Sequence, residues 1–352
     1  MSDSTRAVHV EGVGALFAAC ERRGVRRVVH ISAIGVDTVS ETAFARTKRE
    51  ADEALIARDL DWVTLRPSVV VGRGAYGGSA LIRALAALPV MVPLANADRL
   101  MQPVHVDELS DTIAFFLRSD APVRRVLEIV GPRPITLHET IVAYRAWLGL
   151  VPVPTIGLPR VLARLAFAIG DVISLLGWRP PLRTTALRQL DRDVIGDPSE
   201  WTKITAIRPS SLKAILASDP AGAQEKWFAR LYLLKALVLA VLAAFWVATG
   251  VITLYSGRPA AEALLREAGW PEAWVAVSAI GGGILDVLLG IAVAVRQTAK
   301  ATLITTLVVS VGYLVAASAL LPRLWIDPLG SLVKIFPIMV LTLVALAILD
   351  DR

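Results

Sequence analysis

The sequence predicts two kinds of structure in one chain: an α/β domain built on a parallel sheet, followed by an all-α bundle of four membrane-spanning helices. Short apolar runs alternate with helix-forming segments in the first half, a pattern typical of parallel sheets with helices on both faces. After residue 227, long windows are almost free of charge. The 352 residues are 55% hydrophobic, with a mean hydropathy of +0.59, above the range usual in soluble proteins.

The first elements follow from residue type and spacing. Apolar residues spaced for one face predict a helix over residues 7–23, which Gly24 ends. A short buried strand is expected at 28–31. Residues 44–58 are rich in Ala, Glu, Lys and Leu and predict a helix. An apolar run with three consecutive valines predicts the next strand at 61–71.

The later elements continue this alternation. Residues 102–117 predict a short extended piece and an amphipathic helix whose start Asp107 caps. Residues 126–140 predict a strand, a Gly-Pro turn and a helix that opens near Thr136. The segment 158–178 is apolar with few charges. It predicts a helix packed on its own domain, or alternatively one on the membrane surface with Arg160 and Arg164 near the headgroups.

Composition excludes several classes of site. The single cysteine, Cys20, allows no internal disulfide, and we expect it to be a small buried residue in a reducing compartment. The net charge of +6 comes without a dense basic run or interleaved aromatic and basic residues, so no nucleic-acid site is expected. The first residues have no apolar core, and we expect no signal peptide.

Five residues in a fixed order suggest a reaction centre. Ser32 ends an apolar run, Phe44 and Lys48 lie one turn apart on a predicted helix, and Arg66 with Pro67 ends the next apolar run. This order resembles the short-chain dehydrogenase/reductase family, in its atypical and extended branches. The resemblance covers residues 7–150 and implies a partial Rossmann-like domain.

The resemblance implies NAD or NADP as cofactor and gives each residue a role. Ser32 and Lys48 match the catalytic Ser and Lys, the first positioning a substrate oxygen and the second bonding the nicotinamide ribose. Lys48, Arg66, Pro67 and Ser68 are the implied cofactor-binding residues. Taken alone, Lys48 is better explained as a solvated helix lysine. Residues 66–68 are equally consistent with an ordinary strand end followed by a turn.

The catalytic Tyr of the family is missing. Phe44 occupies its position, and a phenyl ring has no proton to exchange with a reacting oxygen. Thr38, Ser40, Thr42 or a water are the available substitutes, but an unperturbed hydroxyl is a poor base. Whether the domain is catalytic is therefore left open.

The dinucleotide fingerprint is also missing. Such a site needs a strand, a Gly-rich turn and a helix N-terminus. Gly12 and Gly14 fall within a predicted helix, and Gly72 and Gly74 do not follow the first strand. A sheet starting at Val28 would leave that strand unpaired at an edge. We expect the sequence to be an N-terminally shortened reading of a longer protein.

Residues 1–150 thus form the expected NAD(P)-binding domain without its Gly-rich unit. Residues 151–226 are expected to supply helices like those of a substrate domain, and a linker. Residues 227–352 form the membrane domain. Its four apolar windows each approach the roughly 20 residues needed to span a bilayer, at residues 236–255, 273–295, 301–321 and 329–349.

Short loops set the expected orientation. Lys226, Arg230 and Lys235 precede the first window, and Arg296 and Lys300 separate the second from the third. The positive-inside rule then places both termini and the α/β domain on the cytoplasmic side of the inner membrane. The block resembles the DoxX-like family of four-helix membrane proteins, including its turn, here LLPRLWIDPLG.

Asp286 is the one acid deep within a predicted span. An intramembrane carboxylate is a functional-site hypothesis by default. Alternatively, a protonated Asp286 bonds a neighbouring helix, eased by the adjacent Gly281, Gly282 and Gly283. The windows hold no His or Cys, so no metal site is expected.

Three functions follow from these observations. The first is a membrane-anchored oxidoreductase or NAD-dependent epimerase/dehydratase-like protein. The second is a non-catalytic, nucleotide-sensing or scaffolding subunit of a membrane complex, favoured by Phe44. The third places the function in the membrane helices around Asp286. The partners implied are the lipid bilayer and, in the second case, other membrane proteins.

Overall fold

The computed structural model describes residues 5–37, 42–178, 180, 184 and 192–349. The chain divides into two compact units. The first comprises Met1–Gly170 with Pro181–Arg230, and the second Asp171–Pro180 with Leu231–Arg352.

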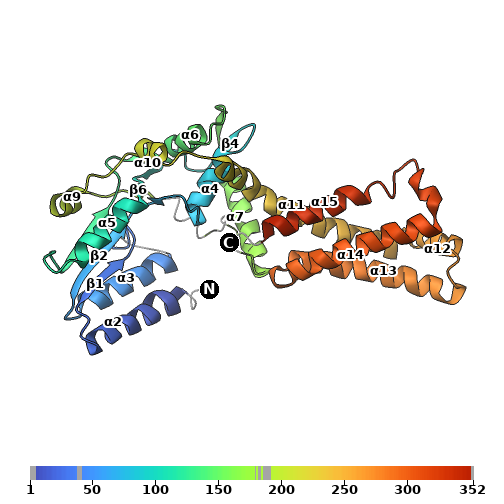
Figure 1. The fold of residues 1–352 in the computed structure, drawn as a ribbon, viewed down its shortest axis with the longest axis horizontal. Helices are drawn as coiled ribbons and strands as arrows, with labels where there is room; N and C mark the ends of the chain where they lie inside the picture. The colour runs from blue at the N-terminus through green and yellow to red at the C-terminus, as the bar shows by residue number, and fades with distance from the viewer. Residues whose placement is uncertain (1–4, 38–41, 179, 181–183, 185–191, 350–352) are drawn as a thin grey trace. The chain divides into compact units, whose positions relative to one another are not determined.

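The first unit contains a three-stranded parallel sheet (Figure 1). Its order is β1 (Arg27–Ile31), β2 (Asp61–Pro67) and β7 (Arg125–Ile129). Val29 of β1 lies opposite Val63 of β2. This parallel sheet confirms the predicted α/β class, and β1 lies at its edge, as expected for the strand that contains Val28.

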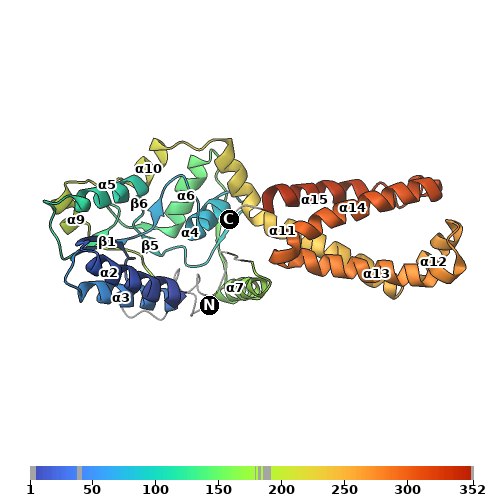
Figure 2. The same ribbon diagram turned by 60° about the horizontal axis from the view of Figure 1, so that its bottom comes forward.

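Helices cover both faces of this sheet (Figures 1 and 2). The π-helical turn η1 (Ala7–Gly12), α2 (Val13–Arg22) and α3 (Ala43–Ile56) lie on one face, and α5 (Val106–Leu117) lies on the other. Successive side chains of a strand point to opposite faces. Trp62 accordingly packs with Phe17 and Leu55, while Val63 and Leu65 pack with Leu109 and Phe116.

The remaining elements of this unit flank the main sheet. Three two-stranded ladders pair β3 (Val70–Val71) with β6 (Val104–His105), β4 (Val92–Leu94) with β9 (Thr155–Gly157), and β5 (Leu100–Met101) with β8 (Ile135–Thr136). The helices are α4 (Gly77–Ala86), α6 (Leu137–Trp147), α9 (Ser199–Thr205) and α10 (Leu212–Ser218). A second apolar core joins α4, α6 and α10 around the buried Tyr144 and Leu148.

The predicted strand over residues 61–71 is wrong as a single element. β2 ends at Pro67, and the amide of Ser68 donates to Ile129 O at 3.0 Å. The chain then leaves the main sheet, and Val70–Val71 pairs with β6 instead. Two strands in different ladders therefore replace one, because apolar content alone does not reveal where a strand changes partner.

Two helix starts were predicted, and one is corrected. Thr136 caps α6 as expected, accepting a hydrogen bond from the amide of Glu139 at 3.0 Å. Helix α5 is capped by His105 rather than Asp107. The Nδ1 atom of His105 accepts from the amide of Asp107 at 3.3 Å, and Glu108 accepts from the amide of His105 at 3.1 Å.

The second unit is helical. Its helices are α11 (Ala223–Leu254, which begins in the first unit), α12 (Arg258–Glu267), α13 (Glu272–Ala294), α14 (Arg296–Leu320), the 3-10 turn η2 (Pro322–Trp325) and α15 (Ile335–Leu349). Three of them, α11, α13 and α14, are long and apolar enough to cross a membrane. α15 has 15 residues, a length of about 22 Å at 1.5 Å per residue. The fourth span, expected at 329–349, therefore stays a prediction.

Glycines bring α11 and α13 into close contact. A Cβ atom on Gly250 would lie 2.4 Å from Gly283 O, and one on Gly290 would lie 2.7 Å from Ala243 O. Small residues at such crossings let helix backbones approach within a membrane. α14 packs against both α13 and α15.

Candidate active site

The carboxyl ends of β1 and β2 hold most of the predicted site residues. Ser32 follows β1, and its amide donates to Leu65 O at 2.7 Å. Two residues later, the amide of Ile34 donates to Pro67 O at 3.1 Å. These bonds fix Ser32 and Pro67 at the same edge of the sheet. In open parallel sheets, ligands bind outside this edge.

Lys48 reaches this edge from α3. Its Nζ donates to Ile31 O at 2.9 Å, beside Ser32. Burial lowers the pKa of Lys48, and the carboxylate of Asp52 partly opposes that shift. The Ser32 hydroxyl is buried and has no hydrogen-bond partner among the described residues. The structure thus brings the predicted Ser and Lys together around one backbone carbonyl.

Phe44 lies one turn before Lys48 on α3, as predicted. Its side chain is 39% exposed, and its ring meets the His9 ring edge-to-face at 5.3 Å between centroids. Of the proposed substitutes, Thr42 caps α3 by accepting from the amide of Ala45 at 3.2 Å. Thr38 and Ser40 lie outside the described residues.

His9 is the residue that sequence reasoning missed. Its Nδ1 lies 3.1 Å from the Thr47 hydroxyl, which itself donates to Ala43 O at 2.9 Å. While the single hydroxyl proton is donated to Ala43 O, the Thr47 oxygen accepts from His9 Nδ1. The neutral ring then carries its proton on Nδ1 and leaves Nε2 as the basic nitrogen. Partial burial, then the charges of Lys48 and His30, lower the pKa of His9 and favour this neutral form.

A chain of three largely buried ionisable side chains, His30, Asp52 and Arg66, lies beneath the site. His30 Nε2 lies 3.3 Å from one oxygen of Asp52, and Arg66 Nε lies 3.1 Å from the other. Arg66 also pairs with Asp37 at 2.7 Å. Asp52 is only 1% exposed. The chain therefore ties α3 to β1 and β2, and it commits the Arg66 guanidinium to two carboxylates.

Ser68 faces a different segment. Its hydroxyl donates to Val194 O at 3.1 Å, and its side chain is buried. Of the residues predicted to bind the cofactor, Lys48 and Pro67 therefore lie beside Ser32. Arg66 instead pairs with Asp52 of α3, and the Ser68 hydroxyl is bonded to the backbone of Val194.

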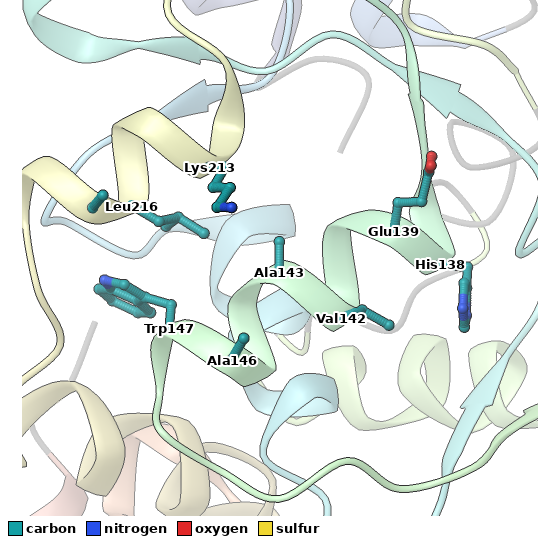
Figure 3. A pocket seen from close by; sticks show the side chains of 9 residues that line it. His138, Glu139, Val142, Ala143, Ala146, Trp147, Lys213 and Leu216 are labelled. Atoms are coloured by element: carbon teal, nitrogen blue, oxygen red, sulfur yellow. The ribbon is translucent and has the colours of Figure 1, made fainter.

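A separate surface pocket of about 450 Å³ lies between α6 and α10 (Figure 3). Most of its lining is apolar, and three polar side chains contribute to it. The lining residues are His138, Glu139, Val142, Ala143, Ala146, Trp147, Lys213, Leu216 and Ala217. None of the predicted site residues lines this pocket.

Asp286 is buried on α13 between the two glycines that contact α11. The Tyr313 hydroxyl of α14 is a hydrogen-bond partner of its carboxyl group. The Oδ1 atom of Asp286 and the indole Nε1 of Trp246 on α11 are both buried without a partner among the described residues. The described part of the chain holds no group of three or more His, Cys, Asp or Glu residues that could bind a metal.

Two family models match separate parts of the chain. The NAD(P)H-binding family model matches residues 2–82, and the DoxX-like family model matches residues 243–343. Both resemblances predicted from the sequence are thereby confirmed. The chain carries an NAD(P)H-binding domain and a DoxX-like domain, and the latter, with its apolar helices, marks a membrane protein.

Two curated proteins are similar to part of the chain. The 40 kDa subunit of mitochondrial NADH-ubiquinone oxidoreductase from Neurospora crassa is 24% identical over 132 residues, covering 38% of this chain and 34% of its own length. Subunit 9 of the 1 alpha subcomplex of mitochondrial NADH dehydrogenase [ubiquinone] from Arabidopsis thaliana is 26% identical over 127 residues, covering 35% of this chain. The match spans 31% of that protein. The chain thus spans about a third of each relative.

Solved structures also show a likeness. The Bordetella bronchiseptica enzyme WbmG, solved with NAD, has 16% identity and a TM-score of 0.45, with 63% of this chain and 65% of that chain covered. A TM-score this low says nothing about activity.

Proposed function

We propose that this chain, which joins an NAD(P)H-binding domain to a DoxX-like membrane domain, is a membrane-anchored oxidoreductase that binds NAD or NADP at the carboxyl ends of β1 and β2. The observation that carries the proposal is the bond from Lys48 to Ile31 O, beside a Ser32 hydroxyl that has no partner in the part of the chain that the structure describes. Two polar groups with bonding capacity to spare lie at the edge where parallel sheets bind ligands.

The residues at this edge fit the sugar side of a dinucleotide. A lysine ammonium has three N–H donors, and Lys48 uses one on Ile31. Two donors are left for vicinal ribose hydroxyls, and Ser32 offers a hydroxyl to a substrate oxygen. The bound cofactor would supply or accept a hydride. In this proposal Arg66 holds Asp52 in place and does not contact the cofactor.

Proton transfer needs a group other than Phe44. His9 touches the Phe44 ring, and its Nε2 is the nitrogen able to take up a proton. A neutral imidazole near physiological pH is the usual general base of proteins. We assign the proton-exchanging role to His9 Nε2, with Thr47 holding the tautomer.

A second candidate is a nucleotide-sensing or scaffolding subunit of a membrane complex. Phe44 favours it, because the ring fills the position of the family's proton donor without replacing its chemistry. The names of the two curated relatives, both subunits of a larger NADH-oxidising enzyme, are consistent with it. A third candidate places the function at Asp286 and Trp246, because Asp286 Oδ1 and Trp246 Nε1 are both buried without a partner among the described residues.

We propose that the helical unit lies in the inner membrane and that the first unit lies on its cytoplasmic side. Lys235, Arg296 and Lys300 flank the spans on the expected inner side. On the opposite side, arginines pair with glutamates, as Arg266 does with Glu272 at 2.9 Å. Cys20, which was expected to be buried, is partly exposed. A membrane-impermeant thiol reagent should therefore leave Cys20 unlabelled in intact cells and label it after lysis. Labelling of intact cells would contradict this orientation.

Calorimetric titration of the detergent-solubilised full chain with NADH and NADPH tests the proposal. We expect one of the two to bind, and Lys48→Ala to weaken its binding by about tenfold or more, as the loss of charge-assisted hydrogen bonds would. Lys213→Ala, at the separate pocket, is the matched control and should bind as the wild type does. Absence of binding by both nucleotides would refute the proposal.

Turnover then separates the first two candidates. Oxidation of the bound nucleotide is followed with a panel of aldehydes, ketones and short-chain quinones. Turnover by the wild type that His9→Gln abolishes, with nucleotide affinity unchanged, supports the oxidoreductase. Nucleotide binding without turnover in the wild type, with activity appearing in Phe44→Tyr, supports the sensing subunit.

A further inference from the structure

Helix α7 (Arg160–Leu175) has a wide apolar face that no other described residue covers. At 100° per residue, its exposed aliphatic side chains fall within an arc of about 140°. Val161 at one end is 74% exposed, and Leu175 at the other is 83% exposed. The large aliphatic residues on this face are Val161, Leu162, Leu165, Ile169, Val172 and Leu175.

The opposite side of the same helix is buried. Ala163, Phe167 and Gly170 lie there and are excluded from solvent. The helix is thus apolar on both sides, although only one side is packed. Arg160 and Arg164 lie along one flank of the exposed face and are themselves exposed, and the half-buried Asp171 lies on the same flank. A broad apolar arc flanked by cationic side chains is the pattern of helices that lie in a membrane interface.

The end of α7 is held at the boundary of two apolar helices. The amide of Arg296 donates to Leu176 O at 3.0 Å, and Trp178 Nε1 donates to Ala294 O at 2.7 Å. Ala294 ends α13 and Arg296 begins α14, both long and apolar enough to cross a membrane. The turn between two consecutive spans lies at the membrane surface.

These hydrogen bonds to the turn between α13 and α14 indicate what covers the apolar face of α7. The residues that follow α7 are hydrogen-bonded to the turn between α13 and α14, which lies where acyl chains meet headgroups. Trp and Arg are side chains that favour this depth in a membrane. We propose that α7 lies in the plane of the membrane surface, with its aliphatic face inserted into a phospholipid bilayer. Arg160 and Arg164 would then contact lipid phosphates from the flank of the helix.

Spin labels on single cysteines test this proposal in the full chain. Cys20 is the only native cysteine, so a Cys20→Ser background allows one label at a time. Labels are placed on Leu165, Ile169 and Val172 of the apolar face. Arg164 provides a label on the cationic flank, and Val151, an exposed residue outside α7, provides a water-exposed control. All of these positions are exposed, so labelling should leave the fold intact.

The labelled chains are reconstituted into vesicles of phosphatidylcholine with a minority of phosphatidylglycerol. Collision of each label with oxygen, which concentrates in the bilayer, is compared with collision with a water-soluble nickel chelate. We expect the ratio at the three aliphatic positions to exceed that at Val151 several-fold, with Arg164 close to Val151.

Two results would overturn the proposal. Equal access of the nickel chelate at the three aliphatic positions and at Val151 would show that the face is in water. Spectral broadening by spin–spin coupling, removed by dilution with unlabelled protein, would show that a second copy of the chain covers it.

Discussion

Neutralising Asp52 should destabilise the α/β unit by about 3 kcal/mol, since removing one member of a buried ion pair costs roughly 3–5 kcal/mol. Asp52 is 1% exposed and lies 3.3 Å from His30 and 3.1 Å from Arg66. Asp52→Asn leaves the Arg66 cation with Asp37 alone, at 2.7 Å. Because Arg66 keeps this second carboxylate partner, its charge is not left uncompensated, and the lower end of the range applies.

Thermal unfolding in detergent measures this loss. For a unit of this size, 1 kcal/mol lowers Tm by about 2–4 °C, so the expected fall is roughly 6–12 °C. Glu53→Gln is the matched control on the same helix. Glu53 is 69% exposed, and its pair with Arg49 spans 3.8 Å, so we expect a change within about 0.5 kcal/mol.

One combination of results would refute this reasoning. If Asp52→Asn unfolds within a degree or two of the wild type while nucleotide binding is lost, Asp52 acts on the ligand and does not hold α3 to the sheet.

Three further predictions concern local contacts. Thr42→Ala removes the cap of α3 and should cost about 1 kcal/mol in denaturant unfolding, whereas Thr42→Ser should cost less. Because the folded state lowers the pKa of His9 below its ordinary 6.5, the folded form resists protonation, so this group lowers stability as pH falls below about 6.5. The loss of Tm between pH 7 and pH 5 should therefore be smaller in His9→Gln than in the wild type, and equal slopes would contradict this. Gly250→Ala places a Cβ 2.4 Å from Gly283 O and should lower Tm of the helical unit, whereas Gly281→Ala meets nothing within 4 Å and should not.

The sequence predicted the sheet well because its signals are local. Apolar runs at β1 and β2 and the helix-forming residues of α3 each determine an element without distant contacts. The break after Pro67 was missed because it depends on the pairing of Val70–Val71 with β6, some thirty residues away in the chain. The His105 cap was missed because imidazole is a rarer capping group than the neighbouring carboxylate.

The candidate site was predictable only in part. Ser32 and Lys48 follow a familiar spacing, and the structure joins them through Ile31 O. His9 could not be found in this way, because its contact with Phe44 links two helices packed side by side. Arg66 matched the pattern, but its ion pairs with Asp52 and Asp37 follow from the three-dimensional packing.

Hydrogen exchange of the full chain with and without the nucleotide that binds tests the location of the site most directly. We expect the nucleotide to slow exchange in peptides covering Arg27–Ile31 with Ser32 and in Ala43–Ile56, where Lys48 lies. Lys48→Ala should abolish that protection. Protection confined to α6 and α10 at the separate pocket, or to the membrane helices, would contradict the assignment of the nucleotide to the ends of β1 and β2.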